Sequence, residues 1–195
     1  EYKLNGGKIE NEVTEYTIET PTFELVSPTK EGYTFIGWFN KDIRVEKIEK
    51  GSTGNLVLTA KYETNKDTKY TVEVYEENLV KDTYTKVDSL ILKGETDKEV
   101  TYELASRTGF TAETENVKGT VASDGSLVLK AYYKRNSYKL TVDTKEETKK
   151  YGESISLEEP SKEGYTFIGW SEKVPSTMPA KNLTINSKWE TIKYT

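Results

Sequence analysis

The residues of this sequence that could do chemistry are chiefly carboxylates, because cysteine and histidine are absent. Their absence excludes thiolate and Cys/His zinc sites, thiol nucleophiles and a Ser-His-Asp triad. Closely spaced carboxylates could bind calcium or pair for acid–base catalysis. The candidates are Glu113, Glu115, Asp124, Glu146 and Glu147. None has EF-hand spacing, so we interpret them as a solvated surface. We expect no catalytic residue, no cofactor and no metal site, and hence no enzyme.

Two tryptophans could bind a ligand rather than catalyse a reaction. The indoles of Trp38 and Trp170 could stack on a sugar or a protein partner. We favour a structural role, in which each indole holds a sheet to a short helical turn. The neighbouring glycines lack the long loop and the Lys-Ser/Thr pair of a phosphate site. Asn5-Gly6-Gly7 is a hairpin signal, because such turns need positive φ.

These tryptophans and glycines belong to a repeated motif. The nine residues 30–38, KEGYTFIGW, recur unchanged at 162–170. A divergent copy at 107–112 keeps the Gly-aromatic-Thr centre and loses the Ile-Gly-Trp end. We expect the motif residues to form a structural core in each repeat. They are Gly32, Tyr33, Phe35, Gly37, Trp38, Gly109, Phe110, Gly164, Tyr165, Phe167, Gly169 and Trp170.

The motif copies lie in three repeats of similar layout. Tyr2, Tyr70 and Tyr138 each open a repeat and are evenly spaced by 68 residues. Short polar segments at 64–68 and 134–137 separate a closing strand from the next opening one. The sequence therefore predicts modules at 1–66, 67–136 and 137–191. Residues 192–195 resemble the start of the middle module, so we expect them to begin a following repeat.

Strands should dominate each module. Apolar and polar residues alternate at 70–74 and 138–142, as a strand with one buried face requires. Similar patterns occur at 17–26 and 154–157, and the denser apolar run at 87–92 favours a more buried strand. The closing strands are predicted at 56–62, 127–133 and 183–189.

A short helical turn is expected before each motif glycine. Proline at 28 or 160 and glycine at the end suit such a turn, and the middle module offers a longer helix at 100–107. The predicted fold is therefore α+β and mainly β. We expect three small β-grasp (ubiquitin-like) modules in an elongated array.

Charge and composition limit the partners. The net charge is −5 with both signs interleaved, which argues against nucleic acid and anionic membranes. No apolar run approaches a membrane span, and we expect a monomeric internal fragment. The aromatic content of 11% indicates packed cores rather than disorder.

The motif resembles a known family. Gly-Tyr-Thr-Phe-Ile-Gly-Trp at 32–38 and 164–170, with its preceding Pro-Thr/Ser-Lys-Glu, resembles the Listeria–Bacteroides (internalin B-type) repeat. The middle module is similar to mucin-binding-type repeats. The resemblance implies β-grasp modules in secreted, often wall-anchored, proteins of Gram-positive and other bacteria, without catalytic residues. The third module has Thr141-Val142-Asp143-Thr144 where the first has Asn-Gly-Gly, which puts a ligand site there in doubt.

Two functions stay open at this stage. The repeats could form a stalk that spaces another domain from the cell wall, which the regular spacing and short joints favour. Alternatively, sheet faces or edges could bind host glycan, mucin or matrix protein. Tyr132 lies beside Tyr133 on a closing strand, so one of the two should point outward. We name Tyr132 as the speculative partner contact.

Overall fold

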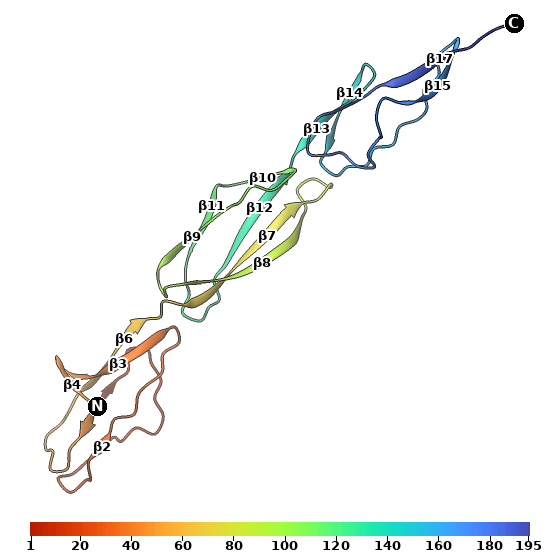
Figure 1. Ribbon diagram of the computed structural model, residues 1–195. Coiled ribbons are helices and arrows are strands. Elements are labelled where there is room, and N and C mark those ends of the chain that lie inside the picture. Colours follow the sequence, from red (N-terminus) through yellow and green to blue (C-terminus); the bar gives the residue numbers. More distant parts are fainter. The chain divides into compact units, whose positions relative to one another are not determined.

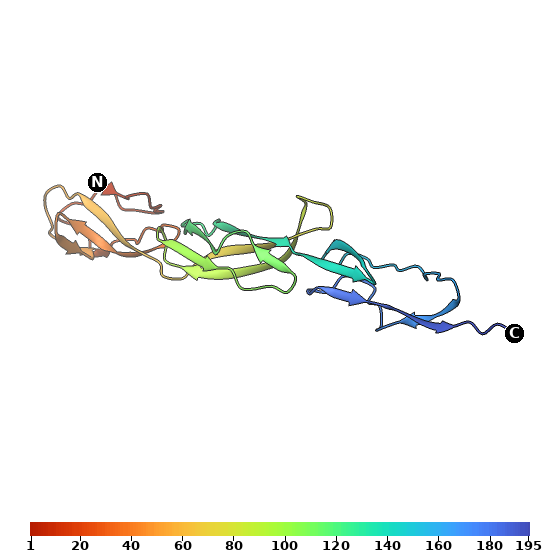
Figure 2. The ribbon, with the colours of Figure 1, turned by 90° about the horizontal axis from the view of Figure 1, so that it is seen from above.

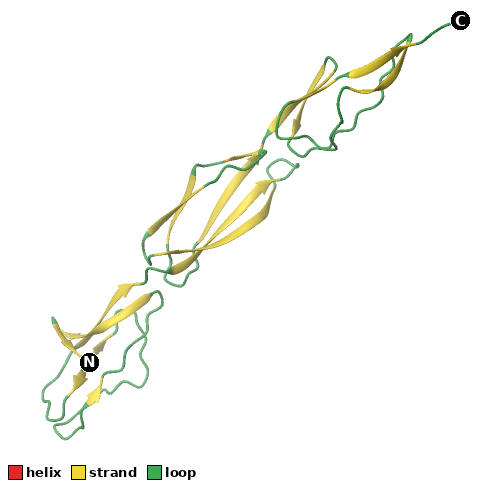
Figure 3. Cartoon of the chain, in the orientation of Figure 1, coloured by secondary structure: helices red, strands yellow, loops and turns green.

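The computed structural model describes residues 1–195, and every regular element in it is a β-strand (Figure 3). The prediction of a mainly β protein is confirmed. No helix capable of crossing a membrane is present. The chain forms two compact units. One comprises residues 1–72, 90–101 and 118–129, and the other comprises residues 73–89, 102–117 and 130–195.

The first repeat contains the strands drawn in red to light orange in Figure 1. They are β1 (Tyr2–Lys3), β2 (Phe23–Glu24), β3 (Tyr33–Asn40), β4 (Ile43–Val45), β5 (Lys47–Ile48) and β6 (Leu58–Thr64). Four of them form a sheet in the order β1-β6-β3-β4, in which β1 is parallel to β6 and the other pairs are antiparallel. β2 and β5 form a separate antiparallel pair.

The middle repeat has the longest strands. They are β7 (Thr68–Glu77), β8 (Tyr84–Gly94), β9 (Glu99–Glu103), β10 (Phe110–Ala112), β11 (Asn116–Thr120) and β12 (Val128–Arg135). Its main sheet has the order β10-β12-β7-β8, and β9 pairs with β11. β12 and β7 lie side by side in both ribbon views (Figures 1 and 2).

The third repeat divides its strands between two small sheets. They are β13 (Ser137–Val142), β14 (Lys145–Lys150), β15 (Tyr165–Trp170), β16 (Leu183–Ile185) and β17 (Ser187–Thr191). The order β14-β13-β16 combines an antiparallel hairpin with a parallel pair. β15 pairs with β17 antiparallel.

The first glycine of each motif copy closes a tight turn rather than a helical one. The N–H of Tyr33 donates to the carbonyl of Lys30 at 3.1 Å, and the same bond joins Phe110 to Arg107 and Tyr165 to Lys162. Gly32, Gly109 and Gly164 have φ of 77°, 79° and 76°. A glycine with positive φ at the third of the four turn residues is typical of a type II turn. The predicted helical turns are therefore wrong, because two residues suffice to reverse the chain.

The Ile-Gly step of the motif forms a β-bulge. The register shifts between Phe35 and Gly37 where β3 pairs with β6. The same shift occurs between Phe167 and Gly169 where β15 pairs with β17. A bulge adds one residue to a strand and turns the following side chain to another face. The repeated motif thus specifies a turn, a strand and a bulge.

Buried apolar side chains form small cores within the repeats, and each repeat has at least one. The first surrounds Trp38, Leu58 and Ala60, the second surrounds Val74, Ala131 and Tyr133, and the third surrounds Leu140, Ile155, Met178, Leu183 and Ile185. Among the motif aromatics, Phe35 packs against the first core, Phe110 against the second and Trp170 against the third. Burial of this limited apolar area is the main favourable term available to such small cores.

The α+β class and the β-grasp assignment are wrong, because the structure lacks the helix that both require. No helix forms at 100–107; residues 100–103 instead belong to strand β9, and residues 104–107 follow it. The run 87–92 is not more buried, since it lies on β8 with Val87 43% and Ile91 70% exposed. β8 lies at the edge of its sheet, so some of its apolar side chains stay exposed. The sequence pattern alone cannot show that a strand takes an edge position.

Candidate functional site

The structure gives Trp38 a structural role. Its side chain is 2% exposed, and its Nε1–H donates to the carbonyl of Val26 at 2.9 Å. The rings of Tyr2 and Phe35 contact it edge-on, with centroids 4.9 and 5.5 Å away. No face of this indole is free for a ligand. Trp170 differs, because it is only partly buried at the edge of the third core.

Tyr132 lies in a group of tyrosines on the middle sheet. Its ring stacks on Tyr75 with centroids 5.0 Å apart and meets Tyr84 edge-on at 5.1 Å. Tyr133 is 3% exposed, and its hydroxyl donates to the carbonyl of Ala105 at 2.8 Å. The two neighbours thus have different environments, and Tyr132 is partly exposed. A contact of Tyr132 with a partner stays a prediction.

Carboxylates beside this group change the acidity of two tyrosines. The hydroxyl of Tyr75 donates to Glu73 at 2.6 Å, and the hydroxyl of Tyr84 donates to Glu113. Since a phenolate beside a carboxylate loses this bond and meets a like charge, the pKa of each tyrosine is raised to about 12. Both hydroxyls therefore stay protonated at neutral pH and keep donating these hydrogen bonds to the carboxylates.

The candidate carboxylates are dispersed and serve as counter-ions or turn acceptors. Asp124 accepts the N–H of Ser126 at 3.0 Å, and hydrogen bonds from Ser126 lower the pKa of Asp124. Glu146 pairs with Lys139 at 2.9 Å and Glu147 with Lys149 at 3.7 Å. The backbone carbonyl of Glu115 accepts the N–H of Leu104. No group of three or more acidic residues is placed to hold a metal ion.

A denser set of contacts joins the first repeat to the middle one, inside the first compact unit. We call it the first joint and define it by Gly32, Thr34, Asn65 and Thr96. The N–H of Asn65 donates to the carbonyl of Gly32 at 3.0 Å, and the Thr34 hydroxyl donates to Oδ1 of Asn65 at 2.7 Å. The N–H of Thr96 then donates to the carbonyl of Asn65 at 2.9 Å.

Side chains reinforce this first joint. Thr96 is fully buried, and its hydroxyl donates to the carbonyl of Gly32 at 2.8 Å. The hydroxyl of Thr64 donates to Glu95 at 2.6 Å, and Tyr33 donates to Asp97. These contacts connect the end of one repeat to the β8–β9 turn of the next.

The second joint, inside the second compact unit, repeats the same pattern with Gly109, Thr111, Asn136 and Tyr151. The N–H of Asn136 donates to the carbonyl of Gly109 at 2.9 Å, and the Thr111 hydroxyl donates to Oδ1 of Asn136 at 2.7 Å. The N–H of Tyr151 donates to the carbonyl of Asn136 at 2.8 Å. Asn136 is the single residue between β12 and β13, so the joint has no free linker.

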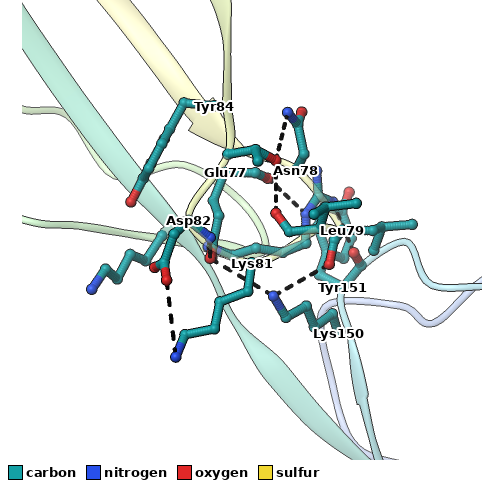
Figure 4. Close-up of polar contacts among 12 residues, drawn as sticks. Glu77, Asn78, Leu79, Lys81, Asp82, Tyr84, Lys150 and Tyr151 are labelled. Carbon is teal, nitrogen blue, oxygen red and sulfur yellow. Dashed lines mark hydrogen bonds and ion pairs between the residues drawn. The ribbon is translucent and has the colours of Figure 1, made fainter.

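A buried charge strengthens the second joint. Glu77 is 5% exposed and accepts the N–H of Arg135 at 3.0 Å and that of Asp82 at 3.3 Å. Lys150 lies between the Glu77 carboxylate and the Leu79 carbonyl, at 3.7 and 3.4 Å (Figure 4). Burial alone would raise the pKa of Glu77, but these hydrogen bonds and the Lys150 charge hold that pKa below its usual range.

Arg135 connects this charge to the turn of the third repeat. Its Nε–H donates to the backbone carbonyl of Glu77 at 2.9 Å, and its Nη1 donates to the carbonyl of Tyr151 at 2.8 Å. The Arg135 guanidinium also lies 4.8 Å from the ring centroid of Phe110, which meets the Tyr151 ring edge-on at 5.7 Å. One side chain therefore contacts the end of the middle repeat and the beginning of the third.

The motif glycines are required where a joint forms. A Cβ added to Gly32 would lie 2.6 Å from the carbonyl oxygen of Ser123, and one added to Gly109 would lie 2.5 Å from Cε1 of Tyr151. Gly164 closes the same turn, yet a Cβ there would meet nothing within 4 Å. All three glycines close a turn, but only Gly32 and Gly109 are crowded by a neighbouring segment. The joints explain why two of them are crowded.

Sequence analysis treated the segments at 64–68 and 134–137 only as polar connectors between modules. The missed residues are Asn65, Asn136, Thr96, Glu77 and Arg135. A signal was present, because an asparagine follows the closing strand in both of the first two repeats. Its partners come from turns distant in sequence, so only the folded chain shows what each asparagine binds.

One protein-family model matches two stretches of the chain. The family model of the Listeria-Bacteroides repeat domain matches residues 1–61 and 99–188. The first stretch covers nearly all of the first repeat, and the second runs from β9 into β17. No solved structure matches the chain.

Proposed function

Because the chain belongs to the Listeria-Bacteroides repeat domain family, which is typical of extracellular surface proteins, we propose that it is a stalk segment that presents other domains outside a bacterial cell. In this function the modules 1–66, 67–136 and 137–191 form an elongated array attached to the cell wall. The chain performs no reaction. We further propose that the first and third repeats are of the internalin B type and the middle one of the mucin-binding type.

The recurrence of one joint at two boundaries is the observation that supports this proposal. Each joint makes three equivalent hydrogen bonds around Asn65 or Asn136. A net contribution of about 1 kcal/mol for each bond is enough to oppose free rotation at a short connection. A spacer needs this property, because a flexible connection would let the presented domain fold back toward the cell.

The dispersed carboxylates support the non-catalytic part of the proposal. Glu146 and Glu147 have lysine partners, and Glu113 accepts a tyrosine hydroxyl. Glycoside hydrolysis by a carboxylate pair would instead need two carboxyl groups facing one another across a substrate. The proposal therefore assigns these side chains to solubility and local packing.

Small-angle X-ray scattering of the whole chain tests the stalk function. Three modules held in line should give a radius of gyration of roughly 25 Å, whereas one compact globule of this length should give about 16 Å. The smaller value would contradict the proposal. A matched set of variants then tests the joints themselves.

The variants remove one threonine hydroxyl at a time. Thr34→Val and Thr111→Val each delete a hydrogen bond to a joint asparagine. The scattering curve of each variant should therefore give a wider distribution of interatomic distances within the molecule. Thr166→Val is the control, because Thr166 follows a motif turn at which Ile192 replaces the asparagine. Equal curves for all three variants would show that the joints do not hold the array.

A further inference from the structure

A groove in the third repeat has the composition of a binding site. It encloses about 910 Å³ and is lined by Trp170, Trp189, Leu157, Val142 and Asp143, among others. Both indoles are partly exposed and contact Phe167, with ring centroids 5.1 and 5.8 Å from it. Ligand sites in proteins commonly combine aromatic walls with a few polar groups in this way.

The first repeat shows why the groove is open. The row of contacting aromatic rings Trp170, Phe167 and Trp189 corresponds to Trp38, Phe35 and Tyr62 in the first repeat. There the ring of Tyr2 also lies directly against the Trp38 indole. Tyr2 pairs with Leu58 of β6, and Trp38 pairs with Ala60, which lies two residues further along the same strand.

The same register position in the third repeat holds a smaller side chain. Val142 pairs with Ile185, two residues before Ser187, the partner of Trp170. Val142 therefore replaces Tyr2, and a branched aliphatic chain cannot cover an indole as a phenol ring does. Trp170 therefore lacks the aromatic ring that lies against Trp38 in the first repeat.

A second difference uncovers the other end of the row. In the first repeat the Tyr62 hydroxyl donates to the carbonyl of Leu4 at 3.0 Å and lies against Gly7. In the third repeat Trp189 takes the place of Tyr62, opposite Phe167. The Asn-Gly-Gly turn is absent there, since the chain reverses at Asp143 into the β13–β14 hairpin.

Hydrogen bonds hold the Trp189 indole in a fixed orientation at the edge of the groove. The Trp189 Nε1–H donates to Oγ of Ser187 at 2.7 Å, and that hydroxyl donates to the Asp143 carboxylate at 3.0 Å. Asp143 also accepts the N–H of Ser187 at 2.7 Å. The indole is thus positioned by a carboxylate before any ligand arrives, which lowers the ordering cost of binding.

The charge of the groove selects among ligand classes. Its acidic lining residues outnumber its basic ones, namely Asp143, Glu146, Glu147 and Glu158 against Lys145 and Lys162. An acidic excess disfavours sulfated or carboxylated glycans and anionic peptides. Carboxylates accept hydrogen bonds from hydroxyl groups, and lysines donate to ring and hydroxyl oxygens. Flat indole surfaces suit a ligand with an apolar face and polar edges.

We propose that the groove formed by Trp170, Trp189 and Asp143 binds a neutral saccharide, which stacks on the indoles while its hydroxyl groups bond to the surrounding carboxylates. This site is additional to the stalk function and does not depend on it. It would let a spacer make weak contacts with a glycan along its length.

Nuclear magnetic resonance of the whole chain tests the site, because its three tryptophans report separately. Neutral hexasaccharides of β-1,4-glucose, β-1,4-N-acetylglucosamine and α-1,4-glucose are added to about 10 mM, ten times a 1 mM Kd. At least one should shift the indole N–H signals of Trp170 and Trp189. The signal of the buried Trp38 should not move, and a heparin hexasaccharide should leave all three unchanged.

Two variants locate the binding. Val142→Tyr restores the ring that covers the equivalent indole in the first repeat, so it should weaken binding at least tenfold while keeping both tryptophans. Trp170→Ala should weaken it to a similar extent by removing one stacking surface. The methyl signals of the fully buried Leu140 and Ile185 report whether each variant keeps the third core folded.

Three results would overturn the proposal. In the first, no neutral saccharide shifts the Trp170 and Trp189 signals. In the second, heparin or a proline-rich peptide shifts them in place of a neutral sugar. In the third, a folded Val142→Tyr variant binds as tightly as the original chain.

Discussion

Replacing Gly109 by alanine tests whether the motif glycine is needed for the joint or only for its turn. Gly109 and Gly164 close the same turn with φ of 79° and 76°. Alanine in this left-handed region costs about 1–2 kcal/mol at either position. Gly164→Ala is therefore a matched control, because its added Cβ meets no atom within 4 Å.

The additional cost at Gly109 comes from the third repeat. The new Cβ would lie 2.5 Å from Cε1 of Tyr151, about 1 Å closer than carbon atoms pack. Retreat of that ring disrupts the edge contact with Phe110 and the bond from the Tyr151 N–H to Asn136. Losing one aromatic contact and one hydrogen bond amounts to about 2 kcal/mol beyond the turn strain.

Amide hydrogen exchange followed by mass spectrometry measures this difference. A loss of about 2 kcal/mol should speed exchange in peptides that contain Asn136 and Tyr151 by about 30-fold. Gly164→Ala should leave those peptides unchanged and affect only the amides around Ile192, whose N–H donates to Gly164. If both variants exchange alike at the second joint, the packing argument is refuted.

Other predictions concern single side chains. Glu77→Gln should destabilise the second joint by about 2 kcal/mol, because it removes the charge that faces Lys150 and accepts two backbone bonds; hydrogen exchange at the joint measures it. Tyr84 should titrate near pH 12 by ultraviolet absorbance. Its folded pKa lies above the unfolded value of 10.0, so its contribution to stability is complete below pH 10 and is lost as the pH rises to 12. Trp38→Phe should cost the first repeat about 2 kcal/mol in thermal unfolding, since it deletes the bond to Val26 and part of a core side chain.

Each of these has its own control. Glu146→Gln breaks an exposed pair with Lys139 and should change stability by less than about 0.5 kcal/mol. In Glu113→Gln the Tyr84 titration should move down toward pH 10, and an unchanged midpoint would exclude Glu113 as its cause. Trp170→Phe should destabilise its repeat less than Trp38→Phe does, because Trp170 is partly exposed. Equal losses would mean that the two indoles are alike in burial.

The repeat was predictable because identical local sequences adopt identical local geometry. The motif at 30–38 and 162–170 forms the same turn, strand and bulge in both copies. The expected helical turn failed for a local reason. Proline followed by charged residues and glycine suits either a helical turn or a type II turn, and in the first repeat an isolated antiparallel bridge between Thr29 and Lys8 holds the segment before the turn extended.

The sequence by itself determined the β class, the recurrence of the turn–strand–bulge motif and the absence of cysteine and histidine chemistry, since these depend on composition and on patterns within a few residues. Only the tertiary structure decided that two asparagines form the same joint, that Glu77 is buried with Lys150, and that Trp38 is covered while Trp170 is not. Each of these depends on a partner from a distant segment. Tyr2 and Val142 cover or uncover an indole through strand register, which no local pattern encodes.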